Sequence, residues 1–349
     1  MKAASPADMM GIMQLERYET GALNMPGMPG FLEIVQDAIA GQLDLSLPGV
    51  LNLFLGVIFQ EFLANGQLVR QLLVVAILGA LMSVLTEAFS HKGASEAGFY
   101  VTYLMAVLLA VSSFYLVVGV LTGLVDTVSN IMRVSIPMMA GLMSMGGNFV
   151  GAAAFHPLLF MALQIVAWFV SGFFVPLVLG AAGLEIASKL SPDGAKLDML
   201  AEIVGKVADW GLKGIIAVFM FLLTLQRITA PIISNVTLRT SRSVVGAVPI
   251  VGDAFTAAMD TVINFSQAAR SGVLVALVLI LCAALIAPLV KILVLSTIYK
   301  LTAAFLQPIA DKRLISLMNG TGKYMLMMFS AAALLGVMCV YTVVILLTF

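Results

Sequence analysis

The chain has little of what soluble proteins and most enzymes depend on, namely charge, histidine and cysteine. Only 10% of its 349 residues are charged, 61% are hydrophobic, and the mean hydropathy is +1.09. A soluble domain has roughly 25% charged and roughly 45–50% apolar residues. The formal net charge is zero, so nothing indicates a nucleic-acid partner. This composition predicts a polytopic membrane protein in contact with the lipid bilayer.

The sequence also lacks motifs that carry catalysis. It contains no glycine-rich nucleotide loop, no HExxH zinc motif and no GxSxG nucleophile elbow. Cys282 and Cys339 lie inside apolar runs, where a thiol behaves as a small hydrophobe. We therefore expect no enzymatic activity and no cofactor.

Long apolar runs predict the fold class. A helix needs about 20 residues to cross ~30 Å of hydrocarbon. We expect an all-α, polytopic membrane helical bundle of about seven to eight transmembrane helices, with interfacial amphipathic helices and one segment broken by glycine and proline. The seven clearest spans lie at 71–89, 99–125, two within 134–184 around a break at 146–157, 214–231, 272–295 and 324–349.

The N-terminal region differs from the rest in charge. Up to Ala64 there are two basic and seven acidic residues, which favours an extracytoplasmic N-terminus because cytoplasmic loops are rich in Lys and Arg. Residues 1–30 contain no apolar signal segment, and the opening fits a chain from which a signal has been removed. Two segments, 31–40 and 50–63, have apolar residues at helical spacing, which predicts short helices along the interface or docked on the bundle. We divide the chain into residues 1–65, extracytoplasmic or interfacial, and 66–349, transmembrane.

Polar connectors separate the later spans. Acids and bases alternate over 185–213, which predicts a solvent-edged amphipathic helix that restarts after a turn at 191–194. A basic connector with Lys300, Lys312 and Arg313 precedes the last span. The Gly320–Lys323 run reads as a loop that enters this span.

The stretch 239–261 is the most unusual part of the chain. With seven spans, its arginines and the basic connector near 300–313 fall on opposite sides of the membrane, whereas an eighth, broken crossing at 244–268 places both groups inside. Asp253 and Asp260 would then share one helix face at membrane depth, where acids are costly and mark pores or contacts. An interfacial helix with solvated carboxylates, and arginines that bind lipid phosphate, is equally open.

His156 lies at the predicted break within 134–184. It is either a buried polar ligand or a histidine in a turn near the interface, and the turn is the plainer interpretation. The candidate pore or assembly residues are therefore Arg239, Arg242, Gly246, Pro249, Gly252, Asp253, Asp260 and His156.

Four separated segments resemble the stage III sporulation protein AE family. They read EFLANG at 61–66, GGNFVGAAAFHPLLF at 146–160, RTSRSVVGAVPIVGDAFTAAMDTV at 239–262 and IYKLTAAFLQPIADK at 298–312. The resemblance implies a multi-pass protein of the mother-cell membrane that surrounds the forespore. It also implies membership of a secretion-like channel complex with other stage III sporulation membrane proteins and a forespore partner protein, and no enzymatic role.

Two other functions stay open. A stand-alone secondary transporter or permease would use a broken helix with acids at mid-depth to bind its substrate. Such transporters often carry an internal repeat, and the two halves of this chain show no convincing one. A scaffold that only anchors soluble partners would tolerate replacement of Asp253 and Asp260 by asparagine.

Overall fold

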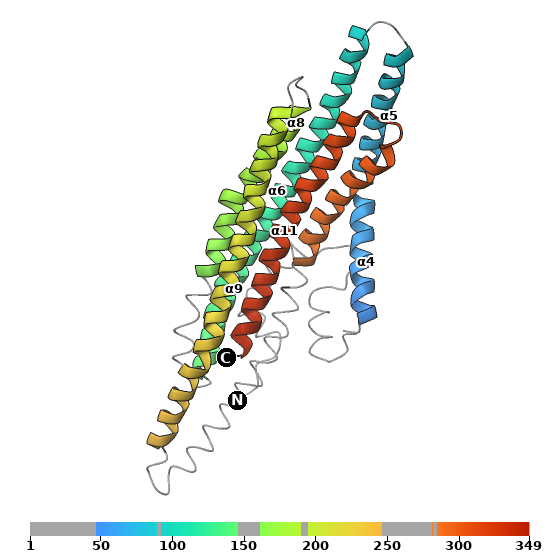
Figure 1. Ribbon diagram of the computed structural model, residues 1–349. Coiled ribbons are helices and arrows are strands. Elements are labelled where there is room, and N and C mark those ends of the chain that lie inside the picture. The colour runs from blue at the N-terminus through green and yellow to red at the C-terminus, as the bar shows by residue number, and fades with distance from the viewer. Residues whose placement is uncertain are drawn as a thin grey trace.

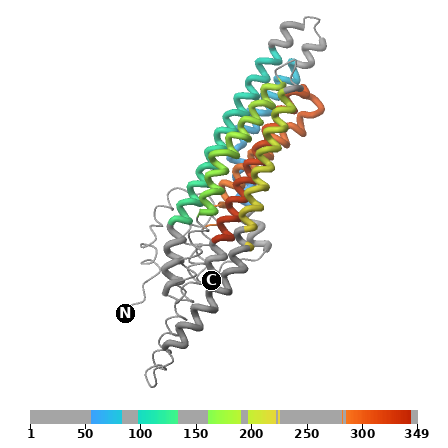
Figure 2. Tube along the Cα trace, turned by 60° about the vertical axis from the view of Figure 1, so that its left-hand side comes forward, coloured from blue at the N-terminus to red at the C-terminus, as the bar shows by residue number. Residues whose placement is uncertain are grey.

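The computed structural model describes residues 47–88, 92–145, 161–189, 195–245, 281 and 285–348, some of them by their backbone alone. Within these ranges the chain forms helices and turns, with no strand. Figures 1 and 2 show the helices side by side along one long axis. The predicted all-α class is therefore confirmed for this part of the chain.

Three antiparallel helix pairs make up most of the bundle, and their connections lie toward the same end in Figure 1. The chain passes through the following helices: Leu47–Ala64 (α4), Gly66–Ala88 (α5), Lys92–Met145 (α6), 161–169 with the π-helical turn Val170–Phe174 (η1) and Val175–Ser188 (α8), Ala195–Val245 (α9), Leu285–Leu306 (the 285–306 helix) and Lys312–Thr348 (α11). The pairs are α5 with α6, α8 with α9, and the 285–306 helix with α11. The start of α9 at Ala195 confirms the helix predicted to follow the 191–194 turn.

Four of the described helices are long and apolar enough to cross a membrane. These candidate spans are Gly98–Arg133, Met161–Ser188, Leu285–Leu306 and Lys312–Thr342. A fifth results if Leu55–Ala64 and Gly66–Met82, which meet at 54°, are counted as one bent span. The protein is thus a helical membrane protein, whereas the expected seven to eight spans are not confirmed.

Helix continuity explains part of this difference. α6 is one helix of 54 residues and continues past the exposed Asp126 and Arg133, so the spans expected at 99–125 and from 134 onward share it. α9 has 51 residues and joins the amphipathic segment that ends near 213 to the span expected at 214–231. A charged residue ends the stretch that suits lipid, but it does not end the helix, because Lys, Arg and Glu are good helix formers.

Two predictions near α11 were wrong. The expected loop at Gly320–Lys323 lies inside α11, where Gly322 packs against the 285–306 helix. A Cβ on Gly322 would lie 3.0 Å from the Ser296 carbonyl oxygen, and the Ser296 hydroxyl donates a 2.7 Å hydrogen bond to the Gly322 carbonyl. Gly322 thus allows the backbones of two helices to approach closely and does not form a turn.

The predicted basic connector is also much shorter than expected. Lys300 belongs to the 285–306 helix, and α11 begins at Lys312. The carboxylate of Asp311 accepts a 2.7 Å hydrogen bond from the Arg313 backbone N–H, as a helix N-cap does. Only 307–311 separates the two helices.

The segment 50–63, predicted as an amphipathic interfacial helix, lies within α4. The helix itself is confirmed, with Leu55, Phe59 and Leu63 exposed and Glu61 half-buried. Whether it lies along the interface or docks on the bundle stays a prediction. α4 and α5 meet at Asn65, whose side-chain amide donates to the Glu61 carbonyl oxygen at 2.8 Å and to its carboxylate at 2.9 Å. The domain division at residue 65 stays a prediction, because 1–46 lie outside the described residues.

Buried tyrosines link the helices across the core. The Tyr103 hydroxyl of α6 donates to the Ile186 carbonyl oxygen of α8 at 3.1 Å. The Tyr299 hydroxyl of the 285–306 helix and the Ser113 hydroxyl of α6 are 2.9 Å apart and form a buried hydrogen bond. α11 packs against α6 and α8 at the centre of the bundle. Together these contacts fix the heights of the helices relative to one another.

Candidate functional site

The candidate residues named from sequence lie mostly beyond the described part of the chain. Gly246, Pro249, Gly252, Asp253, Asp260 and His156 are outside the described residues. Arg239 and Arg242 belong to the last turns of α9, where only the backbone is described. The structure therefore does not show whether these eight residues come together. The broken crossing at 244–268 and the pore or assembly role both stay predictions.

The structure reveals a different set of polar residues on the first half of α9. At about 100° per residue, this helix presents three faces. One face is buried against the bundle and consists of Ala201, Gly205, Ala208, Leu212 and Phe219. A second face is exposed and apolar and consists of Met199, Ile203, Val207, Trp210 and Phe221. Between them lies a charged face made of Glu202, Lys206, Asp209 and Lys213.

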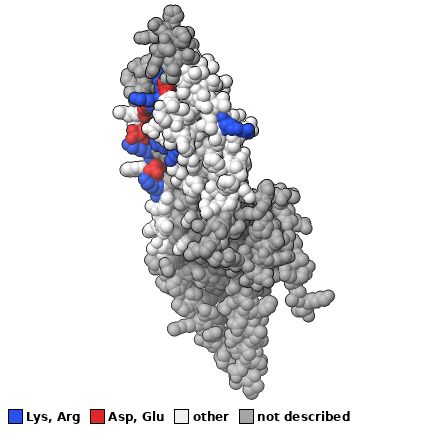
Figure 3. Space-filling model, turned by 90° about the vertical axis from the view of Figure 1, so that its right-hand side faces the viewer, with Lys and Arg blue, Asp and Glu red and all other residues white. Residues whose placement is uncertain are grey.

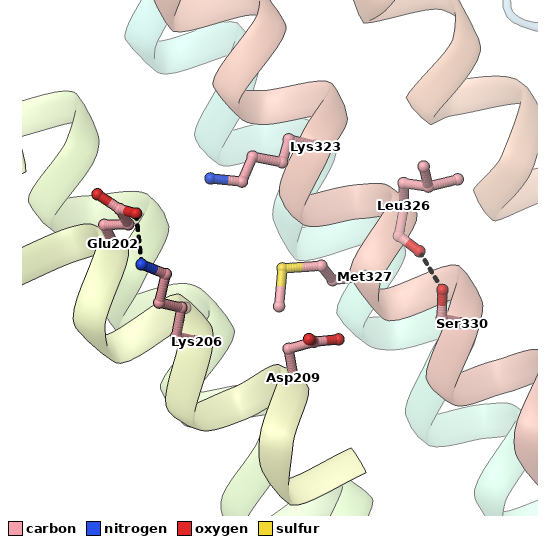
Figure 4. Close-up of a pocket in the computed structure, with 8 residues that line it drawn as sticks. Glu202, Lys206, Asp209, Lys323, Leu326, Met327 and Ser330 are labelled. Carbon is pink, nitrogen blue, oxygen red and sulfur yellow. Dashed lines mark hydrogen bonds and ion pairs between the residues drawn. The ribbon is translucent and has the colours of Figure 1, made fainter. Parts of the chain in front are cut away.

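The charged face borders a groove between α9 and α11, here named the polar groove. It has a volume of about 370 Å³ and is lined by Glu202, Gly205, Lys206, Asp209, Lys323, Leu326, Met327 and Ser330. In Figure 4 the Lys323 side chain points toward α9 and the Asp209 carboxylate points toward α11. At the floor a Cβ on Gly205 would lie 3.6 Å from the Tyr324 ring, which is ordinary van der Waals contact.

The charges of the polar groove are paired along α9 and not across to α11. Lys206 forms a 2.7 Å ion pair with Glu202, and Lys213 forms one of 2.6 Å with Asp209, both one helical turn apart. Lys323 places its ammonium 5.1 Å from the centre of the Tyr324 ring. Exposed pairs of this kind contribute little to folding stability. Each pair is neutral, and neither pair extends across the groove to α11.

Packing contacts set the depth of this charged face. A Cβ on Gly211 would lie 2.9 Å from Phe169 and 3.8 Å from Phe173, both within the apolar span Met161–Ser188. At ~1.5 Å per residue, Phe173 lies about 18 Å from Glu185, the nearest charged residue of its helix toward α9. Asp209 and Lys213, which flank Gly211, thus lie beside the charge-free part of the candidate span Met161–Ser188.

On the face drawn in Figure 3 the charged side chains are unevenly distributed. In Figure 3 acidic and basic atoms gather along one edge, while the described surface beside them is uncharged except for one basic patch. On α6, by contrast, Leu108 and Val111 are exposed apolar side chains. A Lys or Asp at the bilayer centre costs roughly 3 kcal/mol on insertion scales. The α6 surface therefore suits lipid, and the polar groove does not.

The π-helical turn η1 lies beside the lower end of the charged face. Its cap is the Val175 N–H, which bonds to the Val170 carbonyl oxygen, and Phe173 within the turn faces Gly211. Single π turns inside α-helices occur frequently at functional sites. The position of this turn next to Gly211 therefore favours the charged face of α9 as a functional surface.

A polar clasp holds the upper end of α9 to α8. The Lys189 ammonium donates to both carboxylate oxygens of Asp198, at 2.9 and 2.8 Å, and the Ser188 hydroxyl donates to the same carboxylate. The hydrogen bond from Lys189 first, and that from Ser188 second, hold the pKa of Asp198 below its ordinary value. Asp198 lies in the first turn of α9, where negative charge is also favourable.

Among the described residues, no group of three or more His, Cys, Asp or Glu side chains could hold a metal ion. The polar groove offers carboxylates, ammonium groups and a hydroxyl to water and polar solutes. The sequence contained part of this information, because Glu202, Lys206, Asp209 and Lys213 recur at helical spacing. The register of α9 against the 161–188 span was missing from it.

Comparison with known proteins gives the family. A family model described as "Stage III sporulation protein AE" matches residues 30–349. The chain belongs to the stage III sporulation protein AE family. It is also 29% identical over 294 residues to "Stage III sporulation protein AE" of Bacillus subtilis (strain 168). The aligned residues make up 83% of this chain and 73% of that relative. No solved structure matches the chain. The family resemblance drawn from four motifs is thus confirmed.

Proposed function

We propose that this protein is a membrane subunit of the secretion-like sporulation channel complex that links mother cell and forespore, and that it has no enzymatic role. It would reside in the mother-cell membrane around the forespore, with its N-terminus extracytoplasmic. Its partners would be other stage III sporulation membrane proteins of the complex and a forespore partner protein. Membership of the sporulation family and the apolar spans support this role.

The observation that carries the proposal is the depth of the polar groove. Several charged side chains facing lipid would cost an amount comparable with the whole ~5–15 kcal/mol that stabilises a typical fold. Neither an isolated bundle surrounded by lipid nor a simple anchor accounts for such a surface. A subunit whose charged face is enclosed by an assembly accounts for it.

Neutralising the charged face tests the proposal. The variant E202Q/K206Q/D209N/K213Q keeps side-chain size and removes charge, and it should abolish forespore development while other stage III membrane proteins still copurify with the tagged chain. Arg70→Gln is the matched control, because Arg70 is exposed on α5 away from the groove. Copurification is followed by mass spectrometry and development by counting mature spores.

Two results would contradict the proposal. If the wild-type chain copurifies with none of the other stage III membrane proteins, it is not a subunit of their complex. If the purified chain alone moves a solute across proteoliposomes at the rate seen in cells, the stand-alone transporter is the correct function.

A further inference from the structure

We propose that the polar groove between α9 and α11 lines a water-filled path through the membrane, completed by neighbouring subunits, with α9 as the lining helix. The inference rests on the proposed function, since a groove open on one side needs neighbours to enclose water at membrane depth. The inference adds two things to that function: the surface that contacts the solute and the chemical class of the solute.

The three faces of α9 match the three surroundings of a lining helix. Ala208 and Leu212 are buried against the bundle, and Trp210, with 76% of its surface exposed, lies on the apolar outer face. The side chains of Lys206 and Lys213 are each 68% exposed on the charged face. Membrane helices with charged residues at depth turn them toward a bundle interior or a water-filled cavity.

Direct pairing of two copies through this face is electrostatically unfavourable. Copies in one membrane with the same orientation are related by rotation about the membrane normal, so identical residues lie at identical heights. Glu202 would then oppose Glu202 of the other copy, and Lys206 would oppose Lys206. Like charges facing each other are destabilising. Water, which solvates both signs, is the occupant that fits the alternating pattern.

The lining also indicates the class of solute. The groove is lined by two acids, Glu202 and Asp209, and by two bases, Lys206 and Lys323. Channels that select one sign of ion use rings of one charge. The mixed lining therefore suits polar solutes of either sign. Its lower border on α11 carries the exposed Ser330 hydroxyl, which also suits polar solutes and adds no charge.

Cysteine labelling of the assembled complex in sporulating cells tests the inference. A chain with Cys282→Ala and Cys339→Ala is the background, and K206C and S330C report on the groove. W210C on the same helix and L108C on α6 are matched controls. Their native residues are 76% and 69% exposed, as the groove residues are, but they are apolar. The probes are membrane-impermeant methanethiosulfonates, one cationic and one anionic.

Methanethiosulfonates react with thiolates, which form in water and not in lipid. K206C and S330C should react about tenfold or more faster than W210C and L108C. S330C leaves all native charges in place, so the cationic and anionic probes should modify it at rates within about threefold of each other, as expected for a lining without net sign.

Any of the following outcomes would overturn the inference. Slow labelling of K206C and S330C in an intact complex means that protein covers the groove. Equally fast labelling of W210C and L108C means that this part of the bundle lies outside the membrane. A strong preference of S330C for one probe rules out the mixed-charge path. Copurification of the partners is measured in the same cells, so failure of complex formation is distinguished from failure of the lining.

Discussion

The two sides of α11 are built in opposite ways. Toward the 285–306 helix the side is closed, since a Cβ on Gly322 would lie 3.0 Å from the Ser296 carbonyl oxygen. Toward α9 the same helix borders an open groove with charged walls. At Gly322 the missing side chain allows the two backbones to approach closely. On the other side, charged side chains of α9 border open space.

The largest expected effect comes from the closed side. Gly322→Ala places a Cβ 3.0 Å from the Ser296 carbonyl oxygen and 3.3 Å from the Lys300 nitrogen, both backbone atoms that move only with the helix. We expect a loss of about 1–3 kcal/mol in folding stability, as for other overpacked sites. Thermal unfolding of the detergent-solubilised protein measures it.

Gly123→Ala is the matched control for this change. Gly123 is also helical but has no atom within 4 Å of its built Cβ, so alanine should be neutral or stabilising by up to about 1 kcal/mol. Equal effects of the two substitutions would show that the closed side of α11 has no special role.

A second, smaller effect is expected at the hydrogen bond between Tyr299 and Ser113, which ties the 285–306 helix to α6. Tyr299→Phe leaves the Ser113 hydroxyl buried without this partner and should cost about 1–2 kcal/mol. Tyr115→Phe on α6 is the control, because Tyr115 is 84% exposed and its substitution should change the unfolding midpoint very little. A neutral Tyr299→Phe would mean that packing alone holds the 285–306 helix to α6.

The smallest effect is expected where α9 is held by charge. Asp198→Asn weakens the clasp to Lys189 and should cost at most about 1 kcal/mol, because both side chains are partly exposed. The pKa of Asp198 is lowered in the folded protein, so its contribution is fully present above the unfolded pKa of about 3.9 and is lost as pH falls through the folded value.

Unfolding measured between about pH 7 and 3 checks this sign, with the wild type losing its advantage over Asp198→Asn in acid. Lys189→Gln should have a similar effect at neutral pH, and the double variant should lose less than the sum of the two. Additive losses would show that the clasp does not couple α8 to α9.

Sequence reasoning predicted the class of the molecule because composition and apolar runs are local properties. It also found the helix start after 191–194, which proline and glycine mark. It failed at Gly320–Lys323, since a glycine pair in a turn and a glycine pair at a helix crossing look alike without the partner helix. The prediction of a connector at Lys300 is wrong for a similar reason, because a charge after an apolar run resembles the end of a helix.

The polar groove shows the other limit of the sequence. The spacing of Glu202, Lys206, Asp209 and Lys213 predicted an amphipathic helix edged by solvent. Its depth depends on the contact of Gly211 with Phe169 and Phe173, which pairs residues more than 35 positions apart in the chain. Such a register is a property of packing, and no local pattern contains it.

The lengths of α6 and α9 have a mechanical consequence. At ~1.5 Å per residue these helices of 54 and 51 residues extend for about 80 and 75 Å, more than twice the ~30 Å of a hydrocarbon core. Each is a stiff rod over that distance, so a tilt imposed at one end becomes a proportionate sideways displacement at the other. α4 and α5, which meet at a 54° bend, form no such continuous rod.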